Sequence, residues 1–265
     1  MGKTALITGA SVGIGYELSK VFAKNGYNLV LVSRNLEKMK IVSNEIIKLH
    51  DIQIKLIIID LCRQSAPQEL YDEITRENIK IDVLVNNAGI GVYGKYTESS
   101  IEKQMDLLQL NIVTPTMLCR LFGSDMAKRG SGRILNVSST AAFQAGPLLS
   151  TYYASKGYLV LFTEALKNEL RENGVTVTVL CPGPTKTEFF KRNDMIGTKL
   201  DRSPYIMSAA EVAEIGFSGL LKGKNIVIPG VVNNLLAFSV KLSPRRLPTK
   251  IAYFLNKKKV GKGIS

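Results

Sequence analysis

Near its start the chain carries the segment Thr8-Gly9-Ala10-Ser11-Val12-Gly13-Ile14-Gly15, which follows an apolar run at 5–8 and precedes a helical pattern at 14–25. Glycines allow a backbone to turn tightly and to approach a pyrophosphate, which then lies at the positive end of the helix. The spacing is G-x-x-x-G-x-G, whereas the common dinucleotide fingerprint is G-x-G-x-x-G. The segment therefore predicts a phosphate-binding turn, and a turn that serves only helix–strand packing is the alternative.

Beyond this turn, short apolar runs alternate with longer amphipathic stretches. Continuous Val, Ile and Leu runs flanked by Gly, Asn or Asp are typical of strands buried on both faces of a parallel sheet. Such runs occupy 5–8, 28–33, 54–60, 82–86, 133–138, 175–181 and 225–228. Helical patterns occupy 14–25, 36–49, 66–77, 100–129, 153–173 and 209–221. The alternation predicts a doubly wound α/β fold, with helices on both faces of a mostly parallel seven-stranded sheet.

Composition narrows the class of protein and of site. The 265 residues suit one large α/β domain, and 45% apolar with 22% charged residues is ordinary for a globular chain. Cys62, Cys119 and Cys181 lie too far apart for a C-x-x-C motif, and a disulfide framework is not expected. His50 is the single histidine, which argues against a His-ligated metal and a Ser-His-Asp relay. We therefore expect no metal site.

The net charge of +13 is concentrated at one end of the chain. Residues 1–214 hold 25 basic and 22 acidic side chains, whereas residues 215–265 hold ten basic side chains and none that is acidic. A local basic patch is therefore expected, and no nucleic-acid partner. We expect residues 1–230 to form one catalytic and cofactor-binding domain. Residues 231–265 are expected to extend it as basic amphipathic helices, broken near Pro244 and Pro248.

Two interpretations of this extension are open. Its basic residues, which alternate with Leu, Phe, Ile and Val, are Lys241, Arg245, Arg246, Lys250, Lys257, Lys258, Lys259 and Lys262. A basic amphipathic helix lies on an anionic membrane surface, or it packs its apolar face on the body or on a partner subunit; the second is favoured. The uncharged stretch 225–240 is too short and too interrupted to span a bilayer. With no targeting segment recognised, we expect a cytoplasmic protein.

The end of the second expected strand bears on the choice of dinucleotide. Twenty positions after Gly13 the chain reads Ser33-Arg34. An acidic residue at this point binds the ribose 2′-hydroxyl of NAD, whereas an arginine accommodates the 2′-phosphate of NADP. Because a guanidinium pairs with phosphate and no carboxylate stands here, NADP(H) is favoured, with NAD(H) as the alternative. A merely solvated Arg34 is the other interpretation.

The helical pattern near residue 153 contains Tyr152-Tyr153-Ala154-Ser155-Lys156. Residues four apart share a helix face, and a fixed ammonium favours the ionised form of a nearby phenol. Tyr152 and Lys156 are therefore expected to exchange a proton with a carbonyl or alcohol oxygen, with a surface pair as the alternative. Tyr153 and Ser155, on other faces, are expected to serve packing.

The motifs follow one another in a specific series. After the glycine segment come Asp60, Asn86-Asn87-Ala88-Gly89, Asn111, Asn136-Val137-Ser138-Ser139, Tyr152-x-x-x-Lys156 and Pro182-Gly183. This series closely resembles the short-chain dehydrogenase/reductase family, in its single-domain branch with TGxxxGIG and YxxxK motifs, over residues 3 to about 230. The resemblance implies a Rossmann-like fold and an oxidoreductase that passes a hydride between a nicotinamide and a carbonyl or secondary alcohol. An NADP-binding sensor or interaction protein with incidental turnover is the alternative.

The resemblance also implies catalytic roles. Tyr152 matches the catalytic acid–base, and Lys156 matches the residue that lowers the pKa of Tyr152 and holds the nicotinamide ribose. Ser139 matches the hydroxyl that orients the substrate oxygen, with Ser138 as the competing choice. Asn111 matches the asparagine that supports the lysine through a water-linked proton relay.

Cofactor contacts are implied in the same way. They fall at the pyrophosphate turn, the 2′-phosphate, the adenosine and the nicotinamide carboxamide, and include the catalytic Tyr152 and Lys156. The matching residues are Gly9, Ser11, Gly13, Ile14, Gly15, Ser33, Arg34, Asp60, Leu61, Asn87, Ala88, Gly89, Pro182, Gly183, Thr185 and Thr187. Val12 departs from the basic residue that many NADP members carry there, so the preference for NADP depends mainly on Arg34.

Substrate choice is expected in three segments, 90–96, 141–150 and 184–207. The last has mixed polarity and no period, as expected for a functional loop. Together they contain Phe143, Pro147, Leu148, Leu149, Phe189, Phe190 and Met207, which predict a largely apolar pocket. The expected partners are a small carbonyl or alcohol substrate and, by resemblance, further copies of the chain. A homodimer or homotetramer through the long helices 100–129 and 153–173 is implied.

Overall fold

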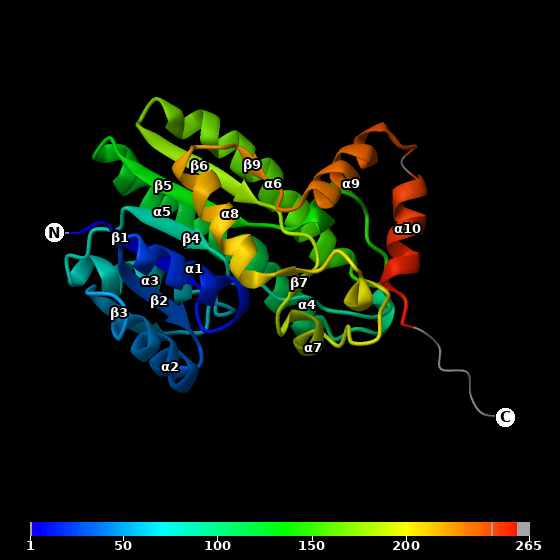
Figure 1. Ribbon diagram of the computed structural model, residues 1–265, viewed down its shortest axis with the longest axis horizontal. Helices are drawn as coiled ribbons and strands as arrows, with labels where there is room; N and C mark the ends of the chain where they lie inside the picture. Colours follow the sequence, from blue (N-terminus) through cyan, green and yellow to red (C-terminus); the bar gives the residue numbers. More distant parts are fainter. Residues whose placement is uncertain (1, 245, 259–265) are drawn as a thin grey trace.

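A computed structural model describes residues 2–244 and 246–258 of the chain. Its main sheet has the strand order β3-β2-β1-β4-β5-β6-β9, and every neighbouring pair is parallel (Figure 1). The strands are β1 (Thr4–Thr8), β2 (Asn28–Ser33), β3 (Ile54–Ile58), β4 (Val83–Asn86), β5 (Gly132–Val137), β6 (Val175–Leu180) and β9 (Ile226–Val227). The predicted seven-stranded α/β fold is confirmed. The order reverses between β1 and β4, where such folds bind ligands beyond the carboxyl ends of the strands.

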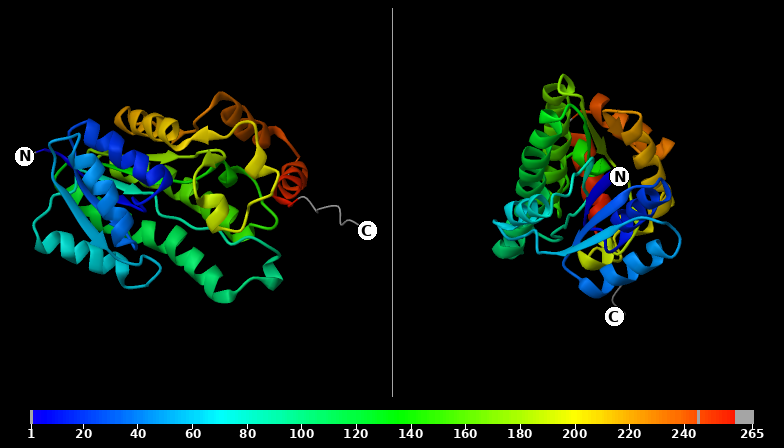
Figure 2. Two further views of the ribbon diagram at one scale, coloured as in Figure 1. Left: turned by 60° about the horizontal axis from the view of Figure 1, so that its bottom comes forward. Right: turned by 90° about the vertical axis from the view of Figure 1, so that its left-hand side faces the viewer.

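Helices cover both faces of the sheet, as Figure 2 shows. One apolar cluster joins the sheet to α1 (Gly13–Lys24), α2 (Leu36–Ile47) and α8 (Ala209–Leu221). A second cluster joins the opposite face to α3 (Ala66–Arg76), α5 (Thr114–Lys128) and α6 (Ser150–Arg171). The strands are buried on both sides, which is why they appear in the sequence as continuous apolar runs.

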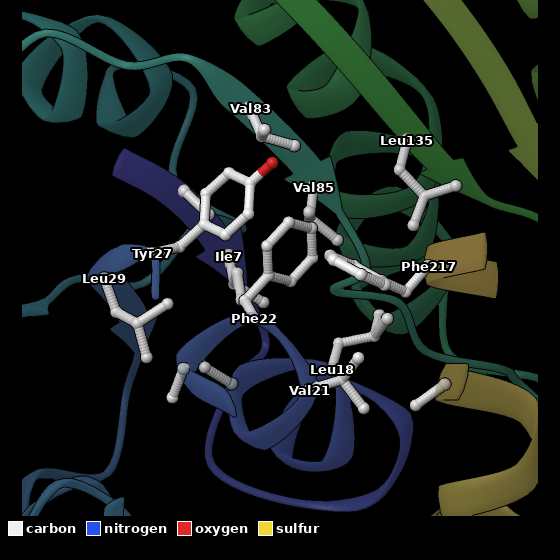
Figure 3. Packing of buried hydrophobic residues seen from close by; sticks show 14 of the residues in the cluster. Ile7, Leu18, Val21, Phe22, Tyr27, Leu29, Val83, Val85, Leu135 and Phe217 are labelled. Carbon is white, nitrogen blue, oxygen red and sulfur yellow. The ribbon is translucent and has the colours of Figure 1, made fainter. Parts of the chain in front are cut away.

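Three aromatic rings anchor α1 on the first face (Figure 3). Phe22 is fully buried, and its ring centroid lies 5.1 Å from that of Tyr27 and 4.9 Å from that of Phe217, in edge-to-face geometry. Such pairs contribute about 0.5–1.5 kcal/mol beyond their area burial. Because α1 begins at Gly13, this packing fixes where the glycine turn and the first turn of α1 lie.

Two predicted helices differ from the structure in ways that affect the site. The predicted helix 100–129 consists of α4 (Ile101–Leu108), a π-helix (Gln109–Val113) and α5, and Asn111 lies in the π-helical segment. The helix predicted at 153–173 is α6, which begins at Ser150, so Tyr152 belongs to its first turn. Polar Ser150 and Thr151 hide this start from a search for apolar periodicity.

The predicted loop 184–207 contains short regular elements. They are β7 (Thr185–Lys186), α7 (Phe189–Arg192), a 3₁₀ turn (Leu200–Arg202) and β8 (Met207–Ser208). β7 and β8 pair in parallel, which brings the two ends of the segment together. The segment is therefore a folded flap over the carboxyl ends of the strands and not an irregular loop.

The extension forms α9 (Val231–Leu242) and α10 (Arg246–Asn256), which lie together at the end of the molecule far from the N-terminus (Figures 1 and 2). Pro244 lies between the helices, as expected, but Pro248 does not break α10. It lies in the first turn, where a proline removes no intrahelical hydrogen bond. Arg245, Lys259 and Lys262 fall outside the described residues. None of the helices described is both long and apolar enough to cross a membrane.

Candidate active site

The glycine segment forms a tight turn at the start of α1. Gly9 and Gly13 have φ of +67° and +59°, values that side chains with a Cβ rarely adopt. A Cβ on Gly15 would lie 2.3 Å from the carbonyl oxygen of Gly9, so Gly15 is required for packing. Gly15 does not line the cleft described below, and its role as a cofactor contact stays a prediction.

The first turn of α1 opens onto this cleft with unpaired backbone donors. Val12 is the N-cap and offers no side-chain acceptor, and the first turn carries no acidic residue. The positive end of the helix and these N–H groups favour an anion. A Cβ on Gly13 would lie 3.1 Å from the side chain of Thr187, so only a glycine leaves this space free. The turn therefore fits a pyrophosphate.

Thr8 and Asn87 brace the turn against β4. The Thr8 hydroxyl oxygen accepts hydrogen bonds from the backbone N–H groups of Asn87 (3.0 Å) and Ala88 (3.1 Å). The Asn87 side-chain amide donates to the carbonyl oxygens of Thr8 (2.9 Å) and Gly9 (3.2 Å). Asn87 therefore lines the cleft while its amide nitrogen holds the turn. The bracing role of Thr8 has no signal in the sequence beyond its place at the strand end.

The opposite side of the turn holds the residues expected to choose between the dinucleotides. The Ser33 hydroxyl donates to that of Ser11 at 2.9 Å, which connects the end of β2 to the turn. Arg34 Nη1 lies 3.6 Å from Asp60 Oδ2, and both side chains are exposed at the cleft mouth. An exposed pair of this kind contributes little stability, so Arg34 exchanges readily to another anion.

Ser139, Tyr152 and Lys156 line the same cleft, beyond β5 and on the first turns of α6. Lys156 is 5% exposed, and its Nζ donates to the carbonyl oxygen of Val137 at 3.0 Å. Burial lowers the pKa of Lys156 from its ordinary value of 10.5 to about 8. The ammonium is therefore held in place but costs free energy to keep charged.

Burial also controls the titration of Tyr152. It raises the pKa of the phenol above its ordinary value, and a hydrogen bond with Ser139 opposes that rise. The Lys156 Nζ lies 5.7 Å from the centroid of the Tyr152 ring. The expectation that Lys156 lowers the pKa of Tyr152 stays a prediction, and burial of the phenol acts in the opposite direction. The neutral phenol is the favoured form.

The structure distinguishes the two candidate serines. Ser138 is buried, and its hydroxyl donates to the carbonyl oxygen of Lys156 at 2.8 Å, which ties β5 to α6. Ser139 is half-buried beside Tyr152; its oxygen accepts from the Ala141 N–H at 3.1 Å. Ser139 is thus the serine placed to meet a substrate oxygen.

Asn111 lies behind the cleft and not in its lining. Its side chain exchanges two hydrogen bonds with the backbone of Ile90, at 3.0 and 2.9 Å, and donates to Ser155 Oγ at 3.0 Å. Ser155 in turn donates to the carbonyl oxygen of Tyr152 at 2.7 Å, so Ser155 joins this network and does not merely pack. A Cβ on Gly89 would lie 3.3 Å from both Asn111 Oδ1 and Lys156 Nζ. Asn111 therefore belongs to the surroundings of the lysine.

The cleft has a volume of about 750 Å³ and continues past Tyr152 into an apolar end. The Phe189 ring centroid lies 5.3 Å from that of Tyr152, with Tyr153 on its other side at 6.2 Å. Apolar residues that line this end are Ala141, Leu149, Tyr153, Phe189, Phe190, Met195, Leu200 and Leu255. Tyr153 thus lines the cleft in addition to packing, whereas Phe143 and Met207 pack in the core.

Two residues of the apolar end are not singled out in the sequence, although Gln144 lies in the segment 141–150, where substrate choice is expected. Gln144 is half-buried in the lining, and its amide has no hydrogen-bond partner within the described part of the chain. Leu255 belongs to α10, whose neighbour Asn256 donates to the carbonyl oxygen of Pro147 at 2.9 Å and accepts from the Tyr153 hydroxyl at 3.3 Å. Neither residue belongs to a motif, and both are found only from their positions in space.

The flap is attached to the cofactor side of the cleft. Lys38 Nζ on α2 lies 3.2 Å from Glu188 Oε1, and Arg192 lies 2.6 Å from Glu188 Oε2. Lys38 and Arg192 hold the pKa of Glu188 below its ordinary value. Together with Thr185 and Thr187 in the cleft lining, this pairing makes the flap a roof over the cleft.

All the predicted cofactor and catalytic residues other than Gly15 and Asn111 thus line one cleft. The glycine turn and α1 lie at one end, Ser139, Tyr152 and Lys156 lie at the middle, and the apolar lining lies at the other end. This arrangement places a group for proton transfer between a site for an anion and a site for an apolar molecule.

Comparison with known proteins agrees with this geometry. Residues 3–195 match a family model described as short chain dehydrogenase. A 17-beta-hydroxysteroid dehydrogenase type 3 from Mus musculus is 35% identical over 195 residues, which is 72% of this chain and 63% of that protein. A diacetyl reductase [(S)-acetoin forming] from Staphylococcus epidermidis is 32% identical over 239 residues, which is 90% of this chain and 91% of that protein.

A solved structure is similar along almost its whole length. It is a short-chain dehydrogenase from Sphingobium yanoikuyae in complex with NADPH, with a TM-score of 0.82 and 26% identity, covering 91% of this chain and 93% of that one. The chain spans less than two thirds of the mouse relative's length. Because the family model covers well over half of the chain, the chain belongs to the short chain dehydrogenase family of NAD(P)-dependent oxidoreductases.

Proposed function

We propose that the protein is an NADP(H)-dependent oxidoreductase that reduces an apolar ketone or aldehyde, with Tyr152 as the proton donor. The observation that carries this proposal is the single cleft in which Tyr152, Ser139 and Lys156 lie between the glycine turn and an apolar pocket. Bound NADPH supplies the hydride, and the protein supplies position and a proton. Neither the neutral phenol nor the anion-binding turn indicates this function by itself. Their position in one cleft does.

Ser139, Tyr152 and Lys156 have separate roles at the substrate oxygen. The Ser139 hydroxyl donates a hydrogen bond to the carbonyl oxygen and so directs it toward Tyr152. Tyr152 gives its proton to that oxygen as negative charge develops there, and the Lys156 ammonium stabilises the phenolate that remains. Burial raises the pKa of Tyr152, so at neutral pH the phenol carries the proton that reduction of a carbonyl requires.

Asn111 acts as a positioning residue in this proposal. It holds the Ile90 backbone and, through Ser155, the main chain at Tyr152. The cofactor residues then have separate tasks. Gly9, Ser11, Gly13 and Ile14 would hold the pyrophosphate, and Gly15 would keep the turn closed. Asp60, Leu61, Asn87, Ala88 and Gly89 would line the adenosine side, and Pro182, Gly183, Thr185 and Thr187 would cover the nicotinamide.

NADP(H) is the proposed dinucleotide because Arg34 is exposed where a 2′-phosphate would lie, beside Ser33. Arg34→Ala is expected to raise the Kd for NADPH by about tenfold to a hundredfold and to leave the Kd for NADH within about twofold. Fluorescence titration of both dinucleotides measures this, with the exposed Arg171→Ala as the control. Equal weakening of NADPH and NADH would remove the assignment.

The apolar end supports a ketone substrate with hydrophobic substituents. Its lining is aromatic and aliphatic, and the Gln144 amide is available to orient a second polar group. The mouse relative is named for hydroxysteroids and the bacterial relative for diacetyl, so the family itself covers both large and small ketones. The lining supports an apolar carbonyl compound as the chemical class of the substrate.

The test is oxidation of NADPH, followed by absorbance, with a panel of aliphatic, aromatic and steroid ketones. Tyr152→Phe is expected to lower kcat by about 10²–10⁴ with unchanged NADPH affinity, because it removes the proton and little else. Tyr158→Phe is the matched control, since Tyr158 lies on α6 outside the cleft. If both variants and the unchanged protein bind NADPH and are equally inert with every ketone, a sensor or binding protein is the better description.

We also propose a homodimer or homotetramer in the cytoplasm. Ile101, Met105 and Leu161 on α4 and α6 are 75%, 59% and 70% exposed, which suits the pairing of these helices between subunits. The thiols of Cys62, Cys119 and Cys181 are free, as in a reducing compartment. Sedimentation of the unchanged protein and of Leu161→Arg tests the assembly, and a Leu161→Arg protein of the same mass as the unchanged one would remove this interface.

A further inference from the structure

The helices α9 and α10 expose an unusual amount of apolar surface. Of the 25 large hydrophobic side chains that are exposed in the described part of the chain, ten lie between residues 231 and 254. They are Val231, Val232, Leu235, Leu236, Phe238, Leu242, Leu247, Ile251, Tyr253 and Phe254. A contiguous apolar surface of this kind marks a place where a protein contacts something other than water.

The way α9 is attached shows that its apolar side faces outward. Only Asn233 and Ala237, one turn apart, are fully buried on this helix among the residues described. Asn233 packs on Gly183, where a Cβ would lie 2.4 Å from its side chain. The helix is therefore fixed to the body by a narrow stripe of small or polar residues, and its Leu and Phe side chains are left outside.

α10 repeats the arrangement with added positive charge. Its buried residues are Pro248, Ala252 and Asn256, each four positions apart, and they face the cleft wall. The remaining surface carries exposed Leu247, Ile251, Tyr253 and Phe254 together with exposed Arg246, Lys250 and Lys257. The sequence has no acidic residue after Glu214 that could neutralise these cations.

We propose that the outer face of α9 and α10 docks on a phospholipid bilayer with anionic headgroups. Apolar side chains on two helices that carry cations and no acidic residue match an interface in which acyl chains lie beside negative charge. A second copy of the chain fits less well, because a symmetric contact would bring two cationic faces together with no carboxylate between them. The candidate subunit interface on α4 and α6 lies on different helices.

Docking would place the cleft close to the lipid surface. Leu255, in the last turn of α10, lines the apolar end of the cleft, while Ile251 and Phe254 on the same helix point outward. One helix thus separates the lipid from the pocket. An apolar substrate that partitions into the bilayer would reach the cleft without crossing much water.

The experiment is co-sedimentation of the full chain with vesicles of phosphatidylcholine alone and with about 30% phosphatidylserine. The unchanged protein is expected to sediment at least about tenfold more with anionic vesicles, and about 0.5 M NaCl should reduce this difference. Binding is measured without substrate or cofactor, so it does not depend on the proposed enzyme activity. Failure of the enzyme proposal and failure of this one are therefore seen separately.

Two variants divide the interaction into its parts. Leu235→Ser/Phe238→Ser/Ile251→Ser is expected to lower sedimentation with both kinds of vesicle by at least about tenfold. Arg246→Gln/Lys250→Gln/Lys257→Gln is expected to remove the preference for anionic vesicles, by about tenfold or more. Matched controls are Ile41→Ser/Ile47→Ser/Leu49→Ser near α2 and Lys48→Gln/Lys128→Gln/Arg171→Gln, all at exposed positions.

Three outcomes would overturn the proposal. They are an unchanged protein that stays in the supernatant with both vesicles, controls that lose as much binding as the test variants, or vesicle binding that ignores headgroup charge and salt. A fourth outcome would show that a second copy of the chain, and not a bilayer, occupies the outer face of α9 and α10. In that case the unchanged protein does not bind vesicles, and it forms an oligomer in solution that dissociates in the Leu235→Ser/Phe238→Ser/Ile251→Ser variant.

Discussion

The body of the molecule and its last two helices use the same residue types in opposite ways. In the body, Leu, Ile and Phe on α1, α2 and α8 point into the sheet and form a continuous core. On α9 and α10, the Leu, Ile and Phe side chains other than Leu255 are exposed, and the buried residues are Asn233, Ala237, Pro248, Ala252 and Asn256. The body is thus stabilised by its own packing, whereas the extension is attached by a few small or polar contacts and offers its apolar side elsewhere.

The largest difference in the free energy of unfolding is expected when the same substitution, Phe to Ala, is made in each of the two regions. Phe22→Ala in the core is expected to lower the free energy of unfolding by about 3–5 kcal/mol, because it removes a fully buried ring and leaves a cavity. Phe238→Ala, at a position 59% exposed, is expected to change it by less than about 0.5 kcal/mol. Urea unfolding measures both. Comparable losses would show that α9 is part of the core and not a separate surface.

A second effect concerns the buried charge of the body. Lys156 has a folded-state pKa of about 8 against its ordinary 10.5, so the unfolded chain binds its proton more tightly between these values. The charge costs stability below pH 8, and that cost disappears as the pH rises toward 10.5. The gain is at most about 3 kcal/mol, at 1.36 kcal/mol for each pKa unit.

The pH dependence of unfolding measures this gain. The Lys156→Met variant lacks this gain. The free energy of unfolding of the unchanged protein should therefore rise relative to that of the variant between pH 8 and 10.5. Lys128→Met, exposed at the end of α5, is the control and should run parallel to the unchanged protein. Parallel curves for Lys156→Met as well would mean that its ammonium costs nothing in the fold.

The smallest effect should appear where the two regions meet. Asn256→Ala removes the hydrogen bonds to Pro147 and Tyr153 from a fully buried position and is expected to destabilise α10 by about 1–3 kcal/mol. Because Leu255 lines the cleft, the KM for an apolar ketone should rise severalfold, with little change in NADPH affinity. Asn234→Ala, at an exposed position on α9, is the control. Hydrogen exchange of α10 amides and steady-state kinetics give the two measurements, and an unchanged KM would separate α10 from the substrate site.

Much of the body could be predicted because its signals are local. A buried parallel strand appears in the sequence as a continuous apolar run. A phosphate turn needs glycines where a side chain does not fit, and Gly9 and Gly13 occupy such positions. Tyr152 and Lys156 share one helix face by their spacing alone. Ser139 could be named only with Ser138 as a rival, because which hydroxyl reaches the cleft depends on how β5 meets α6.

The remaining features depend on segments that are distant in sequence. Leu255 lines the pocket because the end of the chain returns to the flap and to α6. The π-helix that carries Asn111 has no sequence pattern of its own, and whether Pro248 breaks a helix depends on where α10 begins. Each of these required the packing of one element on another.

The sequence by itself determined the sheet, the glycine turn, the Tyr152–Lys156 pair and the concentration of positive charge after Glu214, since each is written in residue type and spacing. Only the tertiary structure decided that Tyr152 and Ser139 share one cleft, in which burial raises the pKa of the phenol. It also decided that the apolar side of α9 and α10 faces outward, since an amphipathic pattern does not say what its apolar side meets.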